Sequence, residues 1–342
     1  MRYAIRCLVY FLSRLFLSLR YRVRIKGMEK LRGLGRKGKV LVLPNHPAYS
    51  DPLILLSHLG PTLDPRPLVY EGTYANPVMW PFMKIINALR VPDMESASSS
   101  ARETAQASVQ AIIDGLKAGS NHILWPSGRL QRDGEEVLGG ARALTDILQA
   151  VPDAEIVLVR TRGLWGSMFS FATTGQLPSL SGRLLGGLWV LLSNLFLFTP
   201  RREITLTVEV LDRSKLPELQ REKVNAFFEA WYNAEGKEPP TYRPYHFLFG
   251  RRTFDYPPRP AMDDLDLSRV RPEVKAEVLA MLADKVKRPL DDEERKPEAT
   301  LDLIGLDSLD RMEFALQVEQ RFGFSTDQVP STVGQLWALA GG

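Results

Sequence analysis

Cysteine and histidine are scarce in this sequence of 342 residues, which contains one cysteine, Cys7, and four histidines. A single cysteine excludes a disulfide framework and a cysteine-rich metal site. The histidines show no metal-ligand spacing, so we expect no structural or catalytic metal. Repeats and low-complexity tracts are also lacking, and 44% of the residues are apolar and 25% charged. This composition excludes disordered and fibrous classes and predicts a globular chain long enough for two domains.

Charge is divided unevenly along the chain. Residues 1–260 carry 34 Lys and Arg against 23 Asp and Glu, a net charge of +11, whereas the remainder carries 10 against 17, a net charge of −7. A basic body with an acidic tail indicates an anionic partner for the body, either a nucleic acid or an anionic membrane. No basic stripe interleaved with aromatic residues is present, so we expect no nucleic acid partner.

The first twenty residues predict an amphipathic, membrane-associating helix. Four polar residues lie within about 40° of one another on a helical wheel, and most of the remaining surface is apolar; these four are Arg2, Arg6, Ser13 and Arg20. Such a helix can lie among lipid headgroups with its arginines toward the phosphates, although a terminal core helix is the alternative. Because arginines interrupt the apolar run, neither a signal peptide nor a transmembrane span is expected.

A second apolar segment, 184–200, has no charged residue over its 17 positions. It is slightly short for a transmembrane span and contains Gly, Ser and Asn. The segment therefore predicts a shallow insertion or a lid over a lipid-binding groove, with a buried helix as the alternative. Together the two segments favour peripheral or shallow attachment to the cytoplasmic face of an inner membrane.

The rest of the chain divides into an α/β domain and a helical bundle. Over 21–250, strand-like runs alternate with helical ones, which predicts a central mixed sheet flanked by helices; the strands are expected at 22–26, 39–43, 122–125, 156–159 and 204–211, and the helices at 101–118 and 216–235. A proline-containing linker follows at 251–269. The last part, 270–342, predicts a small acidic bundle; its helical stretches are 272–287, 309–322, 332–339 and a short turn near Gln328.

The bundle contains the run LIGLDSLD, residues 303–310, directly before an amphipathic helix. Asp307 and Ser308 can simply cap that helix. Capping alone does not require the preceding Gly305, the flanking leucines or the acidic surroundings. The run resembles the G-x-D-S-L signature of acyl carrier proteins, and the resemblance covers essentially all of 270–340. It implies a four-helix carrier domain with 4'-phosphopantetheine attached covalently to Ser308 by a phosphopantetheinyl transferase, so that an acyl group is held as a thioester. The helix N-terminus suits the new phosphodiester.

Near the N-terminus, His46 follows the buried strand 39–43, and Asp51 lies five positions later. The carboxyl ends of strands are where open α/β sheets place ligands. A neutral imidazole, with an ordinary pKa of about 6.5, can accept a proton from an alcohol, and an aspartate on its other nitrogen fixes the tautomer. Asp51 can alternatively cap a helix that begins at Pro52. We expect His58 on the exposed face of that helix.

The order N-H-x-x-x-x-D resembles the glycerolipid acyltransferase family, over about 20–235. The block WPSGR, residues 125–129, looks like the family's F-P-E-G-(T)-R block, and IVLVRTRG, residues 156–163, is similar to its V-P-V block. Gly128 followed directly by Arg129 is closer to the 2-acylglycerophosphoethanolamine branch, as is the opening 19–25. The chain departs from the family at Ser127, where the usual residue is glutamate, and in the G-x-x-F-x-x-R block, for which only Arg90 offers itself as a phosphate ligand.

The resemblance implies catalysis by His46, as general base, with Asp51. It also implies that four residues contact the acceptor, namely Asn45, Ser127, Gly128 and Arg129. Arg129 would hold a phosphate through its guanidinium fork, although a surface arginine is the alternative reading.

Taken together, the two resemblances imply an O-acyltransferase that moves a fatty acyl group from a carrier-protein thioester, or from acyl-CoA, to the free hydroxyl of a lysophospholipid or another hydroxylated lipid. The carrier would be loaded by a separate acyl-ACP synthetase or by a fatty-acid synthase, and its tether would raise its concentration at the site. A hypothesis of another class is a membrane-bound acyl carrier whose weak or inactive body presents acyl groups to a partner enzyme.

Overall fold

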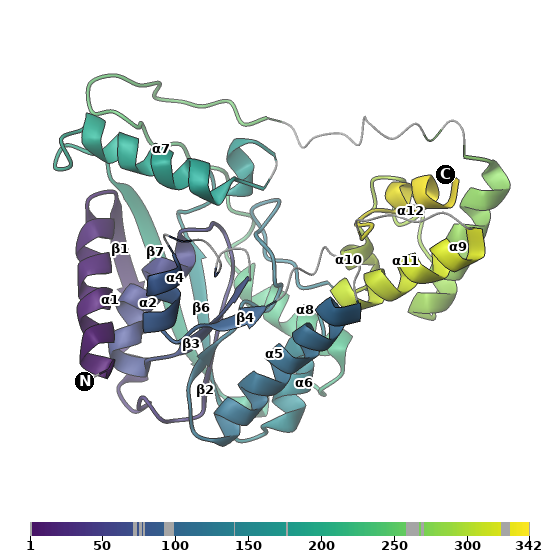
Figure 1. Ribbon diagram of the computed structural model, residues 1–342, viewed down its shortest axis with the longest axis horizontal. Coiled ribbons are helices and arrows are strands. Elements are labelled where there is room, and N and C mark those ends of the chain that lie inside the picture. The colour runs from purple at the N-terminus through teal and green to yellow at the C-terminus, as the bar shows by residue number, and fades with distance from the viewer. Residues whose placement is uncertain are drawn as a thin grey trace.

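The computed structural model describes residues 2–70, 74, 77, 79–91, 99–139, 141–175, 177–257, 267, 270–322 and 329–341. Most of the expected linker and the turn expected near Gln328 lie outside the described residues. Figure 1 shows an α/β body carrying helices on both sides of a sheet, with a separate helical bundle beside it.

A mixed sheet forms the centre of the body. Its seven strands run in the order β1-β7-β6-β2-β5-β3-β4, and they are β1 (Tyr21–Lys26), β2 (Val40–Pro44), β3 (Arg66–Tyr70), β4 (Leu89–Val91), β5 (His122–Ile123), β6 (Glu155–Arg162) and β7 (Arg202–Leu211). Neighbouring strands are parallel except β6 and β7, which are antiparallel. The mixed sheet and flanking helices confirm the fold class predicted for this part.

The helices divide between the two faces of the sheet. They are α1 (Arg2–Ser18), α2 (Asp51–Leu63), α4 (Trp80–Ile85), α5 (Ser99–Lys117), α6 (Ala143–Ala150), α7 (Leu180–Ser193) and α8 (Arg221–Tyr232). Val40 and Val42 of β2 pack into the core with α1, α2 and α4, whereas Leu41 and Leu43 pack into the other core with α5, α6 and α8. Because helices cover both faces of β2, its sequence is a continuous apolar run.

The C-terminal part has its own hydrophobic core. Its helices are α9 (Pro272–Val286), α10 (Leu301–Ile304), α11 (Ser308–Phe322) and α12 (Val333–Gly341). Val278, Leu282, Phe314, Val318 and Leu336 are fully buried within one cluster. The four described helices confirm the predicted small bundle.

The orientation of α1 differs from the expectation that its arginines face lipid. Arg6 donates to both carboxylate oxygens of Asp64, at 2.8 and 2.5 Å, and Arg20 donates to backbone carbonyls, among them that of Pro244 at 3.1 Å. Tyr10 is buried against Gly60 of α2. Arg6 and Arg20 therefore face the body, since partners distant in sequence satisfy their guanidinium groups, and the apolar side of the helix is exposed.

The helix α7 is not a buried helix. Val190 and Leu191 are buried, whereas Leu185 and Trp189 are each 70% exposed. Gly186 lets the helix lie close to Met168, since an added Cβ would be 3.3 Å from that side chain. No helix of the described residues is both long and apolar enough to cross a membrane.

Candidate active site and carrier domain

His46 and Asp51 lie together at the carboxyl end of β2. His46 Nδ1 is 2.7 Å from Asp51 Oδ2, and the indole N–H of Trp125 donates to Asp51 Oδ1 at 3.0 Å. Asp51 is completely buried as the first residue of α2, whose cap position is occupied by Ser50. The Asp51 side chain therefore orients the imidazole instead of capping the helix. With the proton on Nδ1, Nε2 is the nitrogen that can accept a proton.

The environment of the pair favours a charged imidazole. Burial lowers the pKa of His46, but Asp51 and then Glu136 raise it, and the net pKa lies above its ordinary value. Burial raises the pKa of Asp51, while the imidazole and two N–H donors, those of Ala48 and Trp125, lower it. An imidazole with this pKa accepts a proton readily, because the neighbouring carboxylate stabilises the imidazolium that forms.

Asn45 joins two strands at this edge of the sheet. Its amide Nδ2 donates to the carbonyl of Thr161 at 3.0 Å, and its Oδ1 accepts from the Thr161 N–H at 2.7 Å. The side chain is 3% exposed. Asn45 thus extends the β2–β6 pairing beyond Pro44 and holds the backbone directly before His46, and its contact with an acceptor stays a prediction.

The block that follows β5 turns sharply at Gly128, which has a φ of +65°. A left-handed conformation at this position favours glycine. Ser127 Oγ donates to Glu136 Oε1 at 2.5 Å. Arg129 forms an ion pair with Asp302 of the helical bundle, and its side chain is 23% exposed. Burial lowers the pKa of Arg129 to about 10. Arg129 is therefore neither a free surface arginine nor an isolated phosphate ligand in this structure.

Glu136 is a residue of the site that sequence reasoning missed. Besides Ser127, its carboxylate accepts a hydrogen bond from the His46 backbone N–H, at 3.0 Å to Oε2. Glu136 is 1% exposed, and burial raises its pKa to about 7. It lies in a loop without periodicity, so no pattern in the sequence pointed to it.

One face of α8 holds this loop. Asn233 Oδ1 accepts from the Glu136 N–H at 2.9 Å, and Asn233 Nδ2 donates to the Glu136 carbonyl at 2.8 Å. Glu229 Oε1 accepts from the N–H groups of Leu138 and Gly139, and Asn225 Nδ2 donates to the Gly139 carbonyl at 2.7 Å. Asn225, Glu229 and Asn233 recur every fourth residue, which places them on one side of the helix.

Ser308 opens α11 in the bundle. Asp307 caps this helix, because its Oδ1 accepts from the Asp310 N–H at 2.8 Å. Gly305, with a φ of +108°, makes the left-handed turn that ends α10. The first turn of α11 therefore offers backbone N–H groups beside Ser308, and Arg142 and Arg221 lie close to its acidic residues. These groups fit a phosphodiester on Ser308.

Ion pairs connect this end of the bundle to the body. Arg142 lies 3.7 Å from Asp307 and 3.6 Å from Asp310, and Arg221 lies 3.2 Å from Asp310. The body contributes the arginines and the bundle the aspartates, in the sense expected from the charges of the two parts. Figure 1 shows the bundle on the side of α5 and α8, with α10 and the start of α11 nearest the body.

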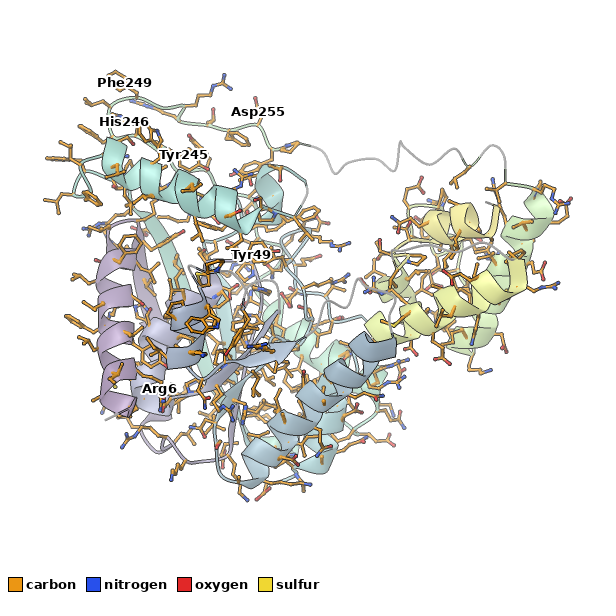
Figure 2. All side chains as sticks on the ribbon, in the orientation of Figure 1. Arg6, Tyr49, Tyr245, His246, Phe249 and Asp255 are labelled. Carbon is orange, nitrogen blue, oxygen red and sulfur yellow. The ribbon has the colours of Figure 1, made fainter. Side chains whose placement is uncertain are left out.

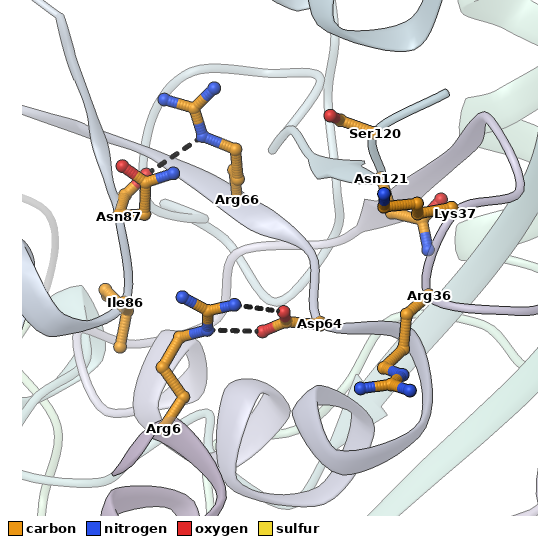
Figure 3. A pocket seen from close by; sticks show the side chains of 9 residues that line it. All are labelled: Arg6, Arg36, Lys37, Asp64, Arg66, Ile86, Asn87, Ser120 and Asn121. Carbon is orange, nitrogen blue, oxygen red and sulfur yellow. Dashed lines mark hydrogen bonds and ion pairs between the residues drawn. The ribbon is translucent and has the colours of Figure 1, made fainter. Parts of the chain in front are cut away.

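A basic pocket lies at the amino ends of the strands, opposite the carboxyl ends where His46 lies (Figure 3). Arg6, Arg36, Lys37 and Arg66 line it together with Asp64. Residues just before β2, β3 and β5 form it, so it is separated by the length of the strands from His46. Arg90, considered as a phosphate ligand, lies instead over the Tyr74 ring at 4.2 Å.

Residues 276–329 match the family model described as a phosphopantetheine attachment site. The bundle is therefore a carrier domain for covalently bound 4'-phosphopantetheine, as the sequence predicted. No curated protein matches the chain. Among solved structures, the chain is similar to the 1-acyl-sn-glycerophosphate acyltransferase PlsC from Thermotoga maritima, with 17% identity over 66% of this chain and 75% of that one and a TM-score of 0.43.

Proposed function

We propose that this protein is an O-acyltransferase that moves a fatty acyl group from its own carrier domain to the free hydroxyl of a lysophospholipid. The observation that carries the proposal is the His46–Asp51 pair, at 2.7 Å, in a body on which a phosphopantetheine carrier domain is docked. Neither feature alone specifies acyl transfer. A general base and a tethered carrier domain together supply what the reaction needs.

His46 acts as the general base. Its Nε2 takes the proton of the acceptor hydroxyl as the oxygen attacks the acyl carbonyl, and the imidazolium later returns that proton to the leaving sulfur, so that one ester bond forms and one thioester bond breaks. Asp51 holds the tautomer and stabilises the imidazolium. Phosphopantetheine on Ser308 would supply the thiol that carries the acyl chain.

The docking contacts support the fused carrier domain as the donor, in preference to free acyl-CoA. Three arginines of the body, Arg129, Arg142 and Arg221, face the acidic end of the carrier domain that contains Ser308. A tether keeps this partner at high effective concentration. Because Arg129 pairs with Asp302, binding of an acceptor phosphate by Arg129 requires the guanidinium to exchange partners.

A continuous apolar face supports attachment to a membrane, where lysophospholipids reside. Exposed apolar residues cover the outer side of α1, the outer side of α7 with the turn after it, and the segment 247–249. These parts adjoin, since Arg20 bonds to the carbonyls of Pro200 and Pro244 and the rings of Phe198 and Phe247 lie 5.3 Å apart. Figure 2 shows Phe249 and His246 on the segment that passes above α7. We place this face on the cytoplasmic side of the inner membrane.

A single-turnover assay tests acyl transfer. The full chain is modified at Ser308 by a phosphopantetheinyl transferase, loaded with one labelled acyl chain by an acyl-ACP synthetase, and mixed with vesicles containing a panel of lysophospholipids. We expect label to move from protein to lipid in the wild type and to remain on the protein in His46→Ala. Ser308→Ala controls for the site of loading.

Label that stays on Ser308 with every lipid, in a folded and loaded protein, would refute the enzyme and support a carrier that is unloaded by a partner. Vesicle sedimentation tests the membrane face separately. We expect the double variant Leu185→Asp/Trp189→Asp to lose binding, whereas Leu316→Asp, at an exposed position on the carrier domain, should retain it.

A further inference from the structure

We propose that Glu136 is a positioning residue for His46: its carboxylate holds the His46 backbone N–H and places a negative charge that stabilises the protonated imidazole. This inference deepens the proposed function and rests on His46 as its base. The family resemblance offered no carboxylate at this place, because the block that normally carries one has Ser127 instead.

Glu136 spans two parts of the site, since Oε2 accepts from the His46 N–H at 3.0 Å and Oε1 accepts from Ser127 Oγ at 2.5 Å. The His46 carbonyl in turn accepts from the Gln131 N–H at 2.8 Å. Both backbone polar groups of His46 are thus held by the loop that contains Glu136, and this fixes the point from which the imidazole projects.

Burial of the Glu136 carboxylate costs free energy. A carboxylate that is 1% exposed is strongly destabilised unless nearby groups compensate. Two hydrogen-bond donors compensate here, but no cationic side chain forms an ion pair with Glu136 among those described. The charged or titratable groups around it are His46, Asp51, Arg129 and the buried Tyr232. A protonated His46 and the Arg129 guanidinium both gain from the negative charge, and Glu136 raises the pKa of His46.

Ser127 contacts the same carboxylate. Its hydroxyl donates to Glu136, so the serine and the loop carboxylate act as one unit. Ser127 is half-buried, whereas Glu136 is held on both backbone groups by Asn233. A carboxylate moved from position 136 to position 127 would remain in the same neighbourhood. We therefore expect that a carboxylate at position 127 can replace the one at position 136.

Histidine NMR on the full chain tests the proposal without knowledge of the acceptor. The four histidines give few imidazole signals, and His46→Ala assigns that of His46. In Glu136→Gln, which keeps the shape but not the charge, we expect the pKa of His46 to fall by about one unit. In the wild type we also expect a second inflection near the Glu136 pKa of about 7, which the variant lacks. Glu238→Gln is the control, since Glu238 is also a buried carboxylate but binds the Gly163 N–H.

The single-turnover assay supplies the second readout. We expect Glu136→Gln to slow transfer about tenfold and Ser127→Glu/Glu136→Gln to recover much of that loss. Glu136→Asp, which keeps the charge, should retain most of the His46 pKa elevation and serves if Glu136→Gln fails to fold. A His46 pKa that is the same in wild type, Glu136→Gln and Glu238→Gln would overturn the proposal. If the wild type transfers no label while the pKa shift is found, the enzyme proposal fails and the contact between Glu136 and His46 stands.

Discussion

The ion pairs between the body and the carrier domain allow a quantitative prediction about transfer. Arg221 and Asp310 lie 3.2 Å apart and are 26% and 13% exposed. We assign this pair about 1 kcal/mol, the upper end for surface pairs. Arg142 is 51% exposed and lies 3.6 to 3.7 Å from its two aspartates, so we assign it about 0.3 kcal/mol. Loss of both contributions, about 1.3 kcal/mol, corresponds to about tenfold in the docking equilibrium.

The variant Arg142→Glu/Arg221→Glu removes these contributions and adds repulsion, so we expect single-turnover transfer from Ser308 to slow by at least about tenfold. Lys223→Glu on the same helix is the matched control, because Lys223 pairs with Glu218 and not with the carrier domain. Raising the salt concentration from 0.1 to 1 M shortens the screening length from about 10 to about 3 Å, which should slow the wild type and, because it screens the added repulsion, speed the variant.

Transfer by the double variant within about twofold of the wild-type rate, or a wild-type rate that does not depend on salt, would refute the reasoning. Either result would mean that docking through these arginines does not limit transfer. Thermal unfolding of each variant separates this outcome from a loss of folded protein.

Three further predictions concern the body. Transfer should decline as the pH falls through the His46 pKa, which lies above its ordinary value, because only the neutral imidazole accepts a proton. In Asp51→Asn this decline should move to lower pH, and the rate should fall about 10²- to 10⁴-fold. Profiles of transfer rate against pH measure both effects. Burial lowers the pKa of His122 to about 4, so between about pH 6.5 and 4 the unfolded chain binds a proton that the folded chain does not. The free energy of unfolding should therefore decrease by about 3 kcal/mol as the pH falls through that range. Urea titrations of His122→Phe should show a smaller decrease. Gly60→Ala would place a Cβ 2.5 Å from the buried Tyr10 ring and should cost about 1–3 kcal/mol, whereas Gly33→Ala, with nothing within 4 Å, should be nearly neutral in the same titrations.

The strands that the sequence predicted are those with a continuous apolar or an alternating run. β2, β6 and β7 are apolar or alternating runs, and their ends were expected to within three residues. β3 and β4 were missed: β4 is a three-residue strand at the sheet edge, and β3 beside it is a short run that contains Pro67. His58 was expected on an exposed helix face but is 8% exposed and bonds to the Ile54 carbonyl. α1 packs across α2, and nothing within the α2 sequence indicates that cover.

At the site too, residues that are close in sequence could be predicted, whereas contacts between residues far apart in sequence could not. His46 with Asp51, and Ser308 with its flanking residues, are close in sequence, so short motifs and their resemblance to known families singled them out. The partners of Arg6, Arg20 and Arg129 lie 58, 224 and 173 residues away, and a helical wheel or a motif cannot show them. For α1 the wheel located the polar stripe correctly and assigned it to the wrong surroundings, because the body supplies the anion and carbonyls that we had expected from lipid.

The loop between β5 and α6 connects the carrier domain to His46, the proposed base. Arg129 near its start and Arg142 at its end contact the carrier domain, and Glu136 between them accepts from the His46 N–H. α8 holds the loop through the backbone of Glu136 and Gly139, so these contacts depend on one loop conformation. Carrier contacts favour that conformation, and the same conformation places the carboxylate beside His46. By linkage, a group that binds only one conformation stabilises it, and docking should therefore stabilise the geometry of the base.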